Sequence, residues 1–280
     1  MKTALTIAGF DPSGGAGVTA DLMVFAAHGL YGTAAVTALT IQSTLGVLAS
    51  HPVDSATLRE MLDCLDQDLP PAGIKIGMVA SSSNVSVISE YLGTLRAMDS
   101  ERDDAPVVFD PVLASSSGRE LLDPNGVAAL RQKLLPLVNW VTPNVDELSL
   151  LAGMPIRSRE DLLIAAHRLQ NQVDPGIGGR RRLGVFAKGG HLDKPDDLLL
   201  TPEGDEHWLA GEPIETNATH GTGCALSSAF LSRLVLGDGP LEAARKAKDY
   251  VASAIRRAPG IGHGKGPMGL LWPLQATQRR

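Results

Sequence analysis

Thr219-His220-Gly221-Thr222-Gly223-Cys224-Ala225-Leu226-Ser227-Ser228 combines a glycine-rich loop with the start of a helix-like run that extends to Leu236. Such a loop can turn several backbone N–H groups toward one point, where unpaired first-turn amides and the helix dipole attract an anion. A thiolate at Cys224 would also be stabilised at a helix start. The stretch therefore indicates a place where a phosphoryl group is bound and transferred.

The bulk composition is that of a globular protein. The chain has 280 residues, of which 44% are hydrophobic and 20% charged, and this length suits one large α/β domain or two small ones. A net charge of -6 argues against a nucleic-acid-binding surface. We find no apolar stretch near the ~20 residues that a membrane span needs. Two cysteines do not make a disulfide framework, so we expect a cytoplasmic protein.

Short apolar runs alternate with amphipathic helical runs along the whole chain. The expected strands are Thr3–Ala8, Thr33–Leu39, Gly73–Ile76, Val107–Phe109, Trp140–Val141 and Gly184–Ala187. The expected helices are Gly17–His28, Ser55–Asp68, Asn84–Arg96, Asn125–Leu134, Val145–Leu151, Arg159–Gln172, Cys224–Leu236 and Leu241–Arg257. This alternation predicts an α/β fold, with a mostly parallel central sheet covered by helices on both faces. No segment resembles a linker, so we expect one domain over residues 1–280. Within Ser55–Asp68, Cys64 falls on the apolar side, which predicts a core position.

The first expected strand leads into a second glycine-rich loop, Gly9-Phe10-Asp11-Pro12-Ser13-Gly14-Gly15-Ala16-Gly17. A strand–loop–helix junction is where open α/β sheets bind ligands. The loop is not a Walker A motif, because Gly15-Ala16 stand where that motif has Lys-Ser/Thr, and it lacks the dinucleotide fingerprint. It could be a tight turn alone, but Ser13 and the three glycines after it favour close approach to a ligand.

Polar side chains follow three other expected strands. Lys188 leaves a strand into Gly189-Gly190-His191 and can reach a phosphate. Asn144 and Glu147 open a helix, either as a reciprocal cap or as ligands of a metal or phosphate. Asp110 ends the strand Val107–Phe109, and a carboxylate there suits Mg²⁺, which usually takes one or two carboxylates.

Taken together, these segments resemble the ribokinase-like superfamily, and within it the hydroxymethylpyrimidine/phosphomethylpyrimidine kinases of thiamine biosynthesis. The matching blocks occur in the family's order over nearly the whole chain. They are Ala8-Gly9, Asp11–Gly17, Ala20-Asp21-Leu22, Thr37–Thr40 with Gln42, Lys75–Met78, Asp110-Pro111-Val112, Thr142-Pro143-Asn144 with Glu147, Lys188–Leu192 and Thr219–Cys224. The last block is the most specific, because sugar kinases of the superfamily mostly carry Asp where Cys224 stands.

The resemblance implies a three-layer αβα sandwich and an ATP- and Mg²⁺-dependent kinase, with relatives suggesting a homodimer. It would phosphorylate the hydroxymethyl group of 4-amino-5-hydroxymethyl-2-methylpyrimidine, and then the monophosphate. Substrate would contact Gly9, Asp21, Gln42 and Met78, and an amide and a carboxylate suit a polar ring with an amino group. The resemblance also implies an anion hole at Gly221, Thr222, Gly223 and Cys224, with Cys224 beside the attacking hydroxyl as a hypothetical general base. Nucleotide phosphates would meet Lys188, Asn144 and Thr222, and Mg²⁺ would be ordered by Asp110 and Glu147.

The sequence departs from the family pattern near the ligands. Ser116 stands where the family usually has a lysine, Phe10 where a small polar residue is usual, and Ser43 where Asn is common. Two other functions therefore stay open. One is a pyridoxal or pyridoxine kinase of the same superfamily, and the other is a pyrimidine- or nucleotide-binding protein without catalysis.

Overall fold

The computed structural model describes residues 1–98, 105–114, 121–173, 182–190 and 196–277. Ser116 and His191 lie outside these residues. The strands are β1 (Thr3–Phe10), β2 (Tyr31–Ser43), β3 (Gly46–Pro52), β4 (Ile74–Ile76), β5 (Val107–Phe109), β6 (Trp140–Val141), β7 (Gly184–Ala187), β8 (Asp197–Leu200) and β9 (Glu206–Leu209). The helices are α1 (Gly17–Ala27), α2 (Ser55–Asp68), α3 (Ser82–Met98), α4 (Pro124–Ala129), α5 (Val145–Ala152), α6 (Arg159–Gln172), α7 (Thr222–Val235), α8 (Pro240–Arg256) and α9 (Trp272–Thr277). A π-helical turn (η1, Leu130–Leu134) and a 3-10 turn (η2, Leu135–Leu137) continue α4.

The described strands form one sheet in the order β3-β2-β1-β4-β5-β6-β7-β8-β9. The six central strands are parallel, and they are β2, β1, β4, β5, β6 and β7 in sheet order. The strand β3 at one edge and the strands β8 and β9 at the other are antiparallel. The prediction of a mostly parallel α/β sheet is confirmed. All six expected strands occur, but β3, β8 and β9 were not predicted.

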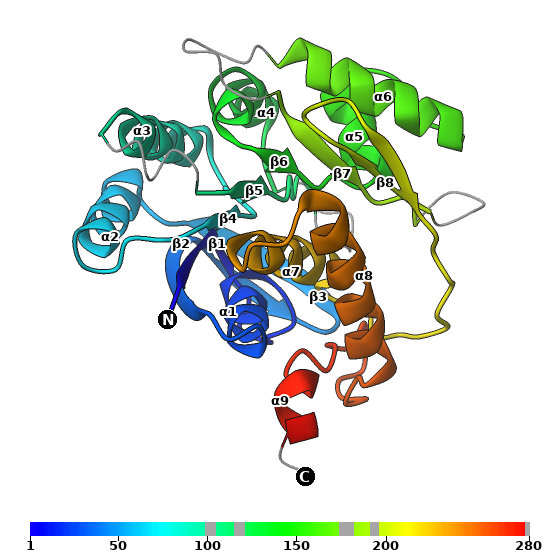
Figure 1. Cartoon of the computed structure of the whole chain (residues 1–280). Coiled ribbons are helices and arrows are strands. Elements are labelled where there is room, and N and C mark those ends of the chain that lie inside the picture. Colours follow the sequence, from blue (N-terminus) through cyan, green and yellow to red (C-terminus); the bar gives the residue numbers. More distant parts are fainter. Residues whose placement is uncertain (99–104, 115–120, 174–181, 191–195, 278–280) are drawn as a thin grey trace.

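Helices cover both faces of this sheet (Figure 1). On one face, residues of α2 to α6 pack with Leu5, Ile7 and Phe109 from the sheet. On the other face, residues of α1, α7 and α8 pack with Ala4 and Val108. Neighbouring residues of one strand thus enter different cores, as the alternation of side chains along a strand requires. The expected three-layer αβα sandwich is confirmed.

Local sequence signals account for where several helices begin. Asp54, Asp123 and Ser158 each accept a hydrogen bond from an amide of the first turn, which caps α2, α4 and α6. The prediction for Cys64 was wrong, because the Cys64 side chain is exposed. In α2 the buried positions are Leu58 and Leu62, four residues apart, and Cys64 lies too far around the helix to share their face. Among the described residues, no helix is long and apolar enough to cross a membrane.

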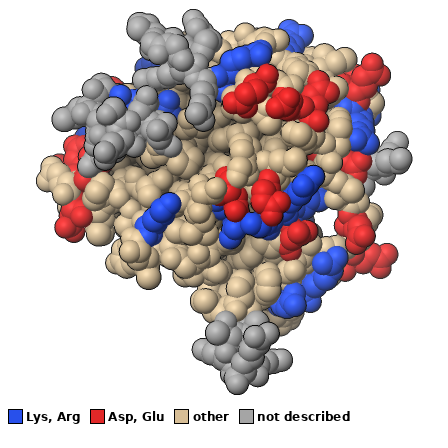
Figure 2. All heavy atoms as spheres, in the orientation of Figure 1, with Lys and Arg blue, Asp and Glu red and all other residues tan. Residues whose placement is uncertain are grey.

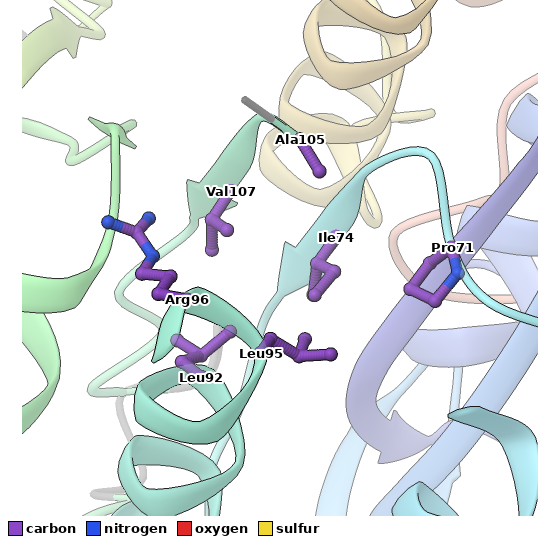
Figure 3. Close-up of a pocket in the computed structure, with 7 residues that line it drawn as sticks. All are labelled: Pro71, Ile74, Leu92, Leu95, Arg96, Ala105 and Val107. Atoms are coloured by element: carbon purple, nitrogen blue, oxygen red, sulfur yellow. The ribbon is translucent and has the colours of Figure 1, made fainter. Parts of the chain in front are cut away.

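Acidic and basic side chains are interspersed on the face of the molecule shown in Figure 2, next to a broad uncharged area. A small apolar hollow lies between α3 and the amino ends of β4 and β5 (Figure 3). Its lining includes Ile74, Leu92 and Val107, and its volume is about 10 Å³. That is room for about one water molecule, so the hollow is a packing defect and not a substrate site. The carboxyl ends of the parallel strands, where open α/β sheets bind ligands, lie at the opposite edge.

Candidate active site

The loop before α7 is held in a conformation that only glycine adopts without strain. Gly221 caps α7 with a φ of 75°, and a Cβ added to it would collide with the carbonyl oxygen of Gly15. The first helical bond runs from the amide of Ala225 to the carbonyl of Gly221, so the amides of Gly223 and Cys224 belong to the unpaired first turn. The expected anion-binding helix start is therefore built against the glycine loop that follows β1.

A partly buried cation lies beside this helix start. Nζ of Lys188, which follows β7, lies 2.9 Å from Oδ1 of Asp110, which follows β5. The same ammonium lies 3.9 Å from Oε2 of Glu147, at the start of α5. A Cβ added at Gly223 would stand 3.1 Å from Nζ of Lys188 and 3.6 Å from Oδ2 of Asp110. The structure thus brings Lys188, Asp110, Glu147 and Gly223 together, as the sequence predicted.

The charges of this cluster explain its titration. Burial would lower the pKa of Lys188, but Asp110 and Glu147 outweigh it and hold that pKa above its usual value. Burial raises the pKa of Glu147 to about 7, with Lys188 opposing and the nearby Asp110 charge adding to the rise. One lysine facing two carboxylates leaves a surplus of negative charge. Oxygen ligands with surplus negative charge fit a hard divalent cation such as Mg²⁺.

Asn144 and Glu147 form a capping box at the start of α5. The amide of Glu147 donates to Oδ1 of Asn144 at 2.9 Å, and the amide of Asn144 donates to Oε2 of Glu147 at 2.8 Å. The interpretation of the pair as a reciprocal helix cap is confirmed. Roles for Asn144 in nucleotide binding and for Glu147 in metal binding stay predictions. Within the described ranges, no group of three or more His, Cys, Asp or Glu side chains is placed to hold a metal ion by itself.

Cys224 does not behave as the sequence predicted. Burial raises the pKa of its thiol to about 11, although the charge of Lys75 and a hydrogen bond from the amide of Gly17 lower it. The expectation was a lowered pKa at the helix start. Removal of the thiol from water outweighs the helix dipole here. The negative charges of Asp110 and Asp21 nearby raise the pKa of the thiol further. The thiol is therefore neutral at pH 7, which argues against a general-base role in this form of the protein.

Asp21 is a second correction. Its side chain is completely buried and was expected to contact the substrate. Its oxygens instead accept hydrogen bonds from Nζ of Lys75 at 2.8 and 3.0 Å, from Oγ1 of Thr6 at 2.6 Å and from Oγ of Ser228 at 2.7 Å. These bonds satisfy the carboxylate inside the protein, so Asp21 joins α1, β1, β4 and α7 and is not placed to meet a ligand.

The other expected substrate residues do lie near one another. A Cβ added at Gly9 would stand 3.1 Å from Sδ of Met78, so the ends of β1 and β4 touch there. Gln42 at the end of β2 is partly buried, and its amide nitrogen lies 3.1 Å from Nε2 of His220. Gly9, Met78 and Gln42 therefore border the same edge of the sheet as the helix start.

Three residues of the site had no role assigned from the sequence. Lys75 neutralises Asp21, and His220 forms a buried pair with Asp11, with Nε2 and Oδ2 2.7 Å apart. Burial would raise the pKa of Asp11, but hydrogen bonds from His220 and Ser13 keep it below its usual value. Ionisable residues within the two glycine loops and within β4 were the available signal. Their partners lie 54 and 209 residues away, which no local pattern shows.

Comparison with known proteins agrees with this geometry. The family model for phosphomethylpyrimidine kinase matches residues 11–269. A Staphylococcus aureus protein named hydroxymethylpyrimidine/phosphomethylpyrimidine kinase is 39% identical over 95% of this chain and 92% of its own length. A Synechococcus elongatus protein of the same name is 38% identical over 98% of this chain and 99% of its own.

Solved structures include kinases for two kinds of ring. Phosphomethylpyrimidine kinase from Clostridium difficile is 34% identical with a TM-score of 0.76, covering 91% of this chain and all of that one. Pyridoxal kinase from Staphylococcus aureus in complex with AMP-PCP is 30% identical with a TM-score of 0.83, covering 97% and 94%. The family match over most of the sequence, the shared fold and the placement of the glycine loops lead to one assignment. This chain belongs to the phosphomethylpyrimidine kinase family.

Proposed function

We propose that this protein transfers a phosphoryl group from ATP to the hydroxymethyl group of 4-amino-5-hydroxymethyl-2-methylpyrimidine, and then a second one to the resulting monophosphate. The observation that carries the proposal is the position of Lys188 and Asp110 next to Gly223 at the α7 start. Phosphoryl transfer needs mainly positioning and neutralisation of charge, which a helix start and a partly buried ammonium supply. Relatives named for both kinase steps support the substrate.

Each group at the helix start has a part in this reaction. The amides of Gly223 and Cys224 bind the transferred phosphoryl oxygens. The left-handed backbone conformation of Gly221 orients these amides toward the phosphoryl group. Thr222 lies in the same turn and meets the nucleotide phosphates together with Asn144. Lys188 supplies a positive charge to the phosphates. Cys224 borders the attacking hydroxyl as a neutral thiol and packs there without accepting a proton.

Mg²⁺ fits the residues around Lys188. Asp110 and Glu147 would hold it, because together they carry more negative charge than Lys188 neutralises. When bound, Mg²⁺ neutralises charge on the phosphates of ATP. ATP itself is supported by the solved complexes of related pyridoxal kinases with AMP-PCP and ADP.

The test is a count of phosphate groups on the product by mass, with ATP, Mg²⁺ and the pyrimidine as substrates. We expect a monophosphate that converts to a diphosphate. Monophosphate alone would remove the second step from the proposal. Binding of the pyrimidine without any ADP release would favour a non-catalytic binding protein.

Pyridoxal is a second candidate substrate, and one observation favours it. The pyridoxal kinase structures superpose on this chain with TM-scores of 0.82 and 0.83, above the 0.76 of the pyrimidine kinase. Sequence identity favours the pyrimidine kinase instead, at 34% against 29–30%. Both substrates in one reaction, with products separated by mass, decide between them. A higher kcat/KM for pyridoxal would move the assignment to pyridoxal kinase.

We further propose that the protein is a homodimer joined through β2 and β3. Leu45, in the turn between the two strands, is 74% exposed, and Leu48 on β3 is 76% exposed. Leu39 and Ile41 on β2 are about half exposed. Clustered exposed apolar side chains at a sheet edge are typical of a subunit interface. Light scattering after size exclusion should give twice the chain mass. Leu48→Asp should give the mass of one chain, and a wild-type monomer would contradict the proposal.

A further inference from the structure

His220 lies where three separate segments of the active site meet. Nε2 of His220 lies 2.7 Å from Oδ2 of Asp11, in the loop after β1, and 3.1 Å from the amide nitrogen of Gln42 on β2. The ring is 6% exposed and packs so closely on Gly15 that any side chain there would collide with it. His220 itself directly precedes the Gly221 cap of α7. His220 thus links the loop before α7, the loop after β1 and the amide of Gln42, which is expected to bind the substrate ring.

The hydrogen on Nε2 of His220 is fixed by Asp11. Asp11 accepts hydrogen bonds from the amide and hydroxyl of Ser13 and from the amide of Ala16. These donors, with His220, keep the pKa of Asp11 low, so the carboxylate is ionised and can only accept. Nε2 of His220 therefore carries a hydrogen. A nitrogen that already donates cannot also accept a hydrogen bond from the NH₂ group of Gln42.

The hydroxyl of Thr40 independently restricts the orientation of the Gln42 amide. The hydroxyl of Thr40 donates to the carbonyl oxygen of Phe10 at 2.9 Å, and Oε1 of Gln42 lies 3.2 Å from that hydroxyl oxygen. A hydroxyl has one hydrogen. Thr40 can therefore accept from Gln42 but cannot also donate to it. His220 and Thr40 therefore favour the same orientation of the Gln42 amide, with its oxygen toward His220 and its nitrogen toward Thr40.

A rotation of the Gln42 amide by 180° exchanges its oxygen and nitrogen at nearly the same positions. The hydrogen on Nε2 of His220 is then shared between Asp11 and the Gln42 oxygen as a three-centre hydrogen bond, and the NH₂ of Gln42 donates to the hydroxyl oxygen of Thr40. We infer that Asp11-bound His220, together with Thr40, holds the carbonyl of Gln42 toward His220 and its NH₂ toward Thr40. His220 is then a positioning residue that determines how Gln42 recognises the substrate ring. Each end of the amide keeps capacity for the ligand, because the oxygen has a second lone pair and the nitrogen a second hydrogen.

The consequence is selectivity for one edge of the ring, and it rests on the proposed function. A free amide can rotate to match either an amino group beside a ring nitrogen or a carbonyl beside a ring N–H. A fixed amide matches the first pattern and leaves polar groups unpaired against the second. Sites that hydrogen-bond a substrate group reject the mismatched analogue strongly, because buried polar groups lose their partners.

The test measures binding of two rings by calorimetry without nucleotide. One ring is 4-amino-5-hydroxymethyl-2-methylpyrimidine, and the other is its 4-oxo analogue. We expect wild type to prefer the amino ring by about 100-fold. His220→Phe removes the donor and should reduce that ratio at least about tenfold. His220→Gln places an amide nitrogen near the position of Nε2 and should restore most of the ratio.

Two further variants control for damage to the fold. His167→Phe removes a matched histidine–carboxylate pair, with Nε2 2.7 Å from Oε1 of Glu206 on the surface, and should change nothing. Asp11→Asn no longer forces a hydrogen onto Nε2 and should lower the ratio as His220→Phe does, even if His220→Phe does not fold. An unchanged ratio in both site variants, or equal loss in His220→Phe and His220→Gln, would overturn the inference. Wild type that binds the amino ring selectively but releases no ADP would instead count against the proposed function alone.

Discussion

Nζ of Lys75 lies 2.8 Å from Oδ2 of Asp21, and neither side chain has any exposed surface. Lys75 is on β4 and Asp21 on α1, so the pair joins the sheet to a helix below the α7 start. Burial would lower the pKa of Lys75, but the charges of Asp21 and Asp110 raise it. The ammonium of Lys75 therefore stays charged at neutral pH and lies near the thiol of Cys224.

Removing one partner of this pair should be costly. Lys75→Met leaves the Asp21 carboxylate buried without its cation, so we expect a loss of about 3–5 kcal/mol in the free energy of unfolding. Lys75→Met combined with Asp21→Asn should recover much of that loss, because the buried charge is gone. Urea unfolding of four proteins tests this: wild type, Lys75→Met, Asp21→Asn and the double variant. A double variant with the full sum of both single losses would speak against a buried ion pair.

Glu147 predicts a pH dependence of stability. Its pKa is about 7 in the folded protein, against an ordinary value of 4.5. Between these values the folded state binds more protons than the unfolded state, so stability falls as pH rises from about 4.5 to 7. The fall should not exceed about 3 kcal/mol. Glu147→Gln should lack it, whereas Asp146→Asn, an exposed neighbour, should keep it. Thermal melts from pH 5 to 8 make this comparison, and parallel curves for wild type and Glu147→Gln would refute it.

The thiol of Cys224 should be slow to react. With a pKa raised to about 11, it holds little thiolate at pH 7.5, so iodoacetamide should modify exposed Cys64 first. Labelling of Cys224 should accelerate toward pH 10. Cys224→Ser should keep kcat within about tenfold, since a loose phosphoryl transfer needs little help from a base. A loss of about 10³-fold or more would reinstate Cys224 as the general base.

Two glycines should respond to alanine in opposite directions. Gly221→Ala forces a side chain into a positive φ and against the carbonyl of Gly15, which should cost at least about 2 kcal/mol. Gly93 lies inside α3, and a Cβ there meets nothing within 4 Å. Gly93→Ala should therefore stabilise the protein by about 0.5–1 kcal/mol. Urea unfolding midpoints test the pair, and equal shifts would contradict the role of Gly221.

The sequence was sufficient to predict the layers of the fold and the sheet edge at which the candidate site lies. Parallel central strands are buried on both faces and read as short apolar runs, so β1, β4, β5, β6 and β7 could be located. The strands β3 and β9 are partly exposed edge or hairpin strands, which form because a neighbour offers hydrogen bonds. The strand β8 pairs antiparallel with β7 and β9, and the described residues between it and either neighbour hold no helix, so the alternation of strands and helices did not indicate it.

Roles of single residues were harder to predict than positions. Lys188, Asp110 and Glu147 converge because they follow strands or open a helix at one sheet edge, which the order of elements already implies. Asp21 was misassigned because its partner Lys75 lies 54 residues away. Whether the pKa of Cys224 rises or falls depends on how much water the fold removes from the thiol, and this is a property of packing. Hydrogen-bond partners and burial belong to tertiary structure.

The position of Lys188 gives the most direct test of the account. Its ammonium stands at the α7 start and should stabilise charge on the transferred phosphoryl group. Lys188→Met should lower the single-turnover rate of phosphoryl transfer from ATP to the pyrimidine by about 10²–10³-fold. Lys246→Met, which breaks a surface ion pair with Asp238, is the matched control and should leave the rate unchanged. A Lys188→Met rate equal to that of wild type would contradict the proposal that phosphoryl transfer occurs at this helix start.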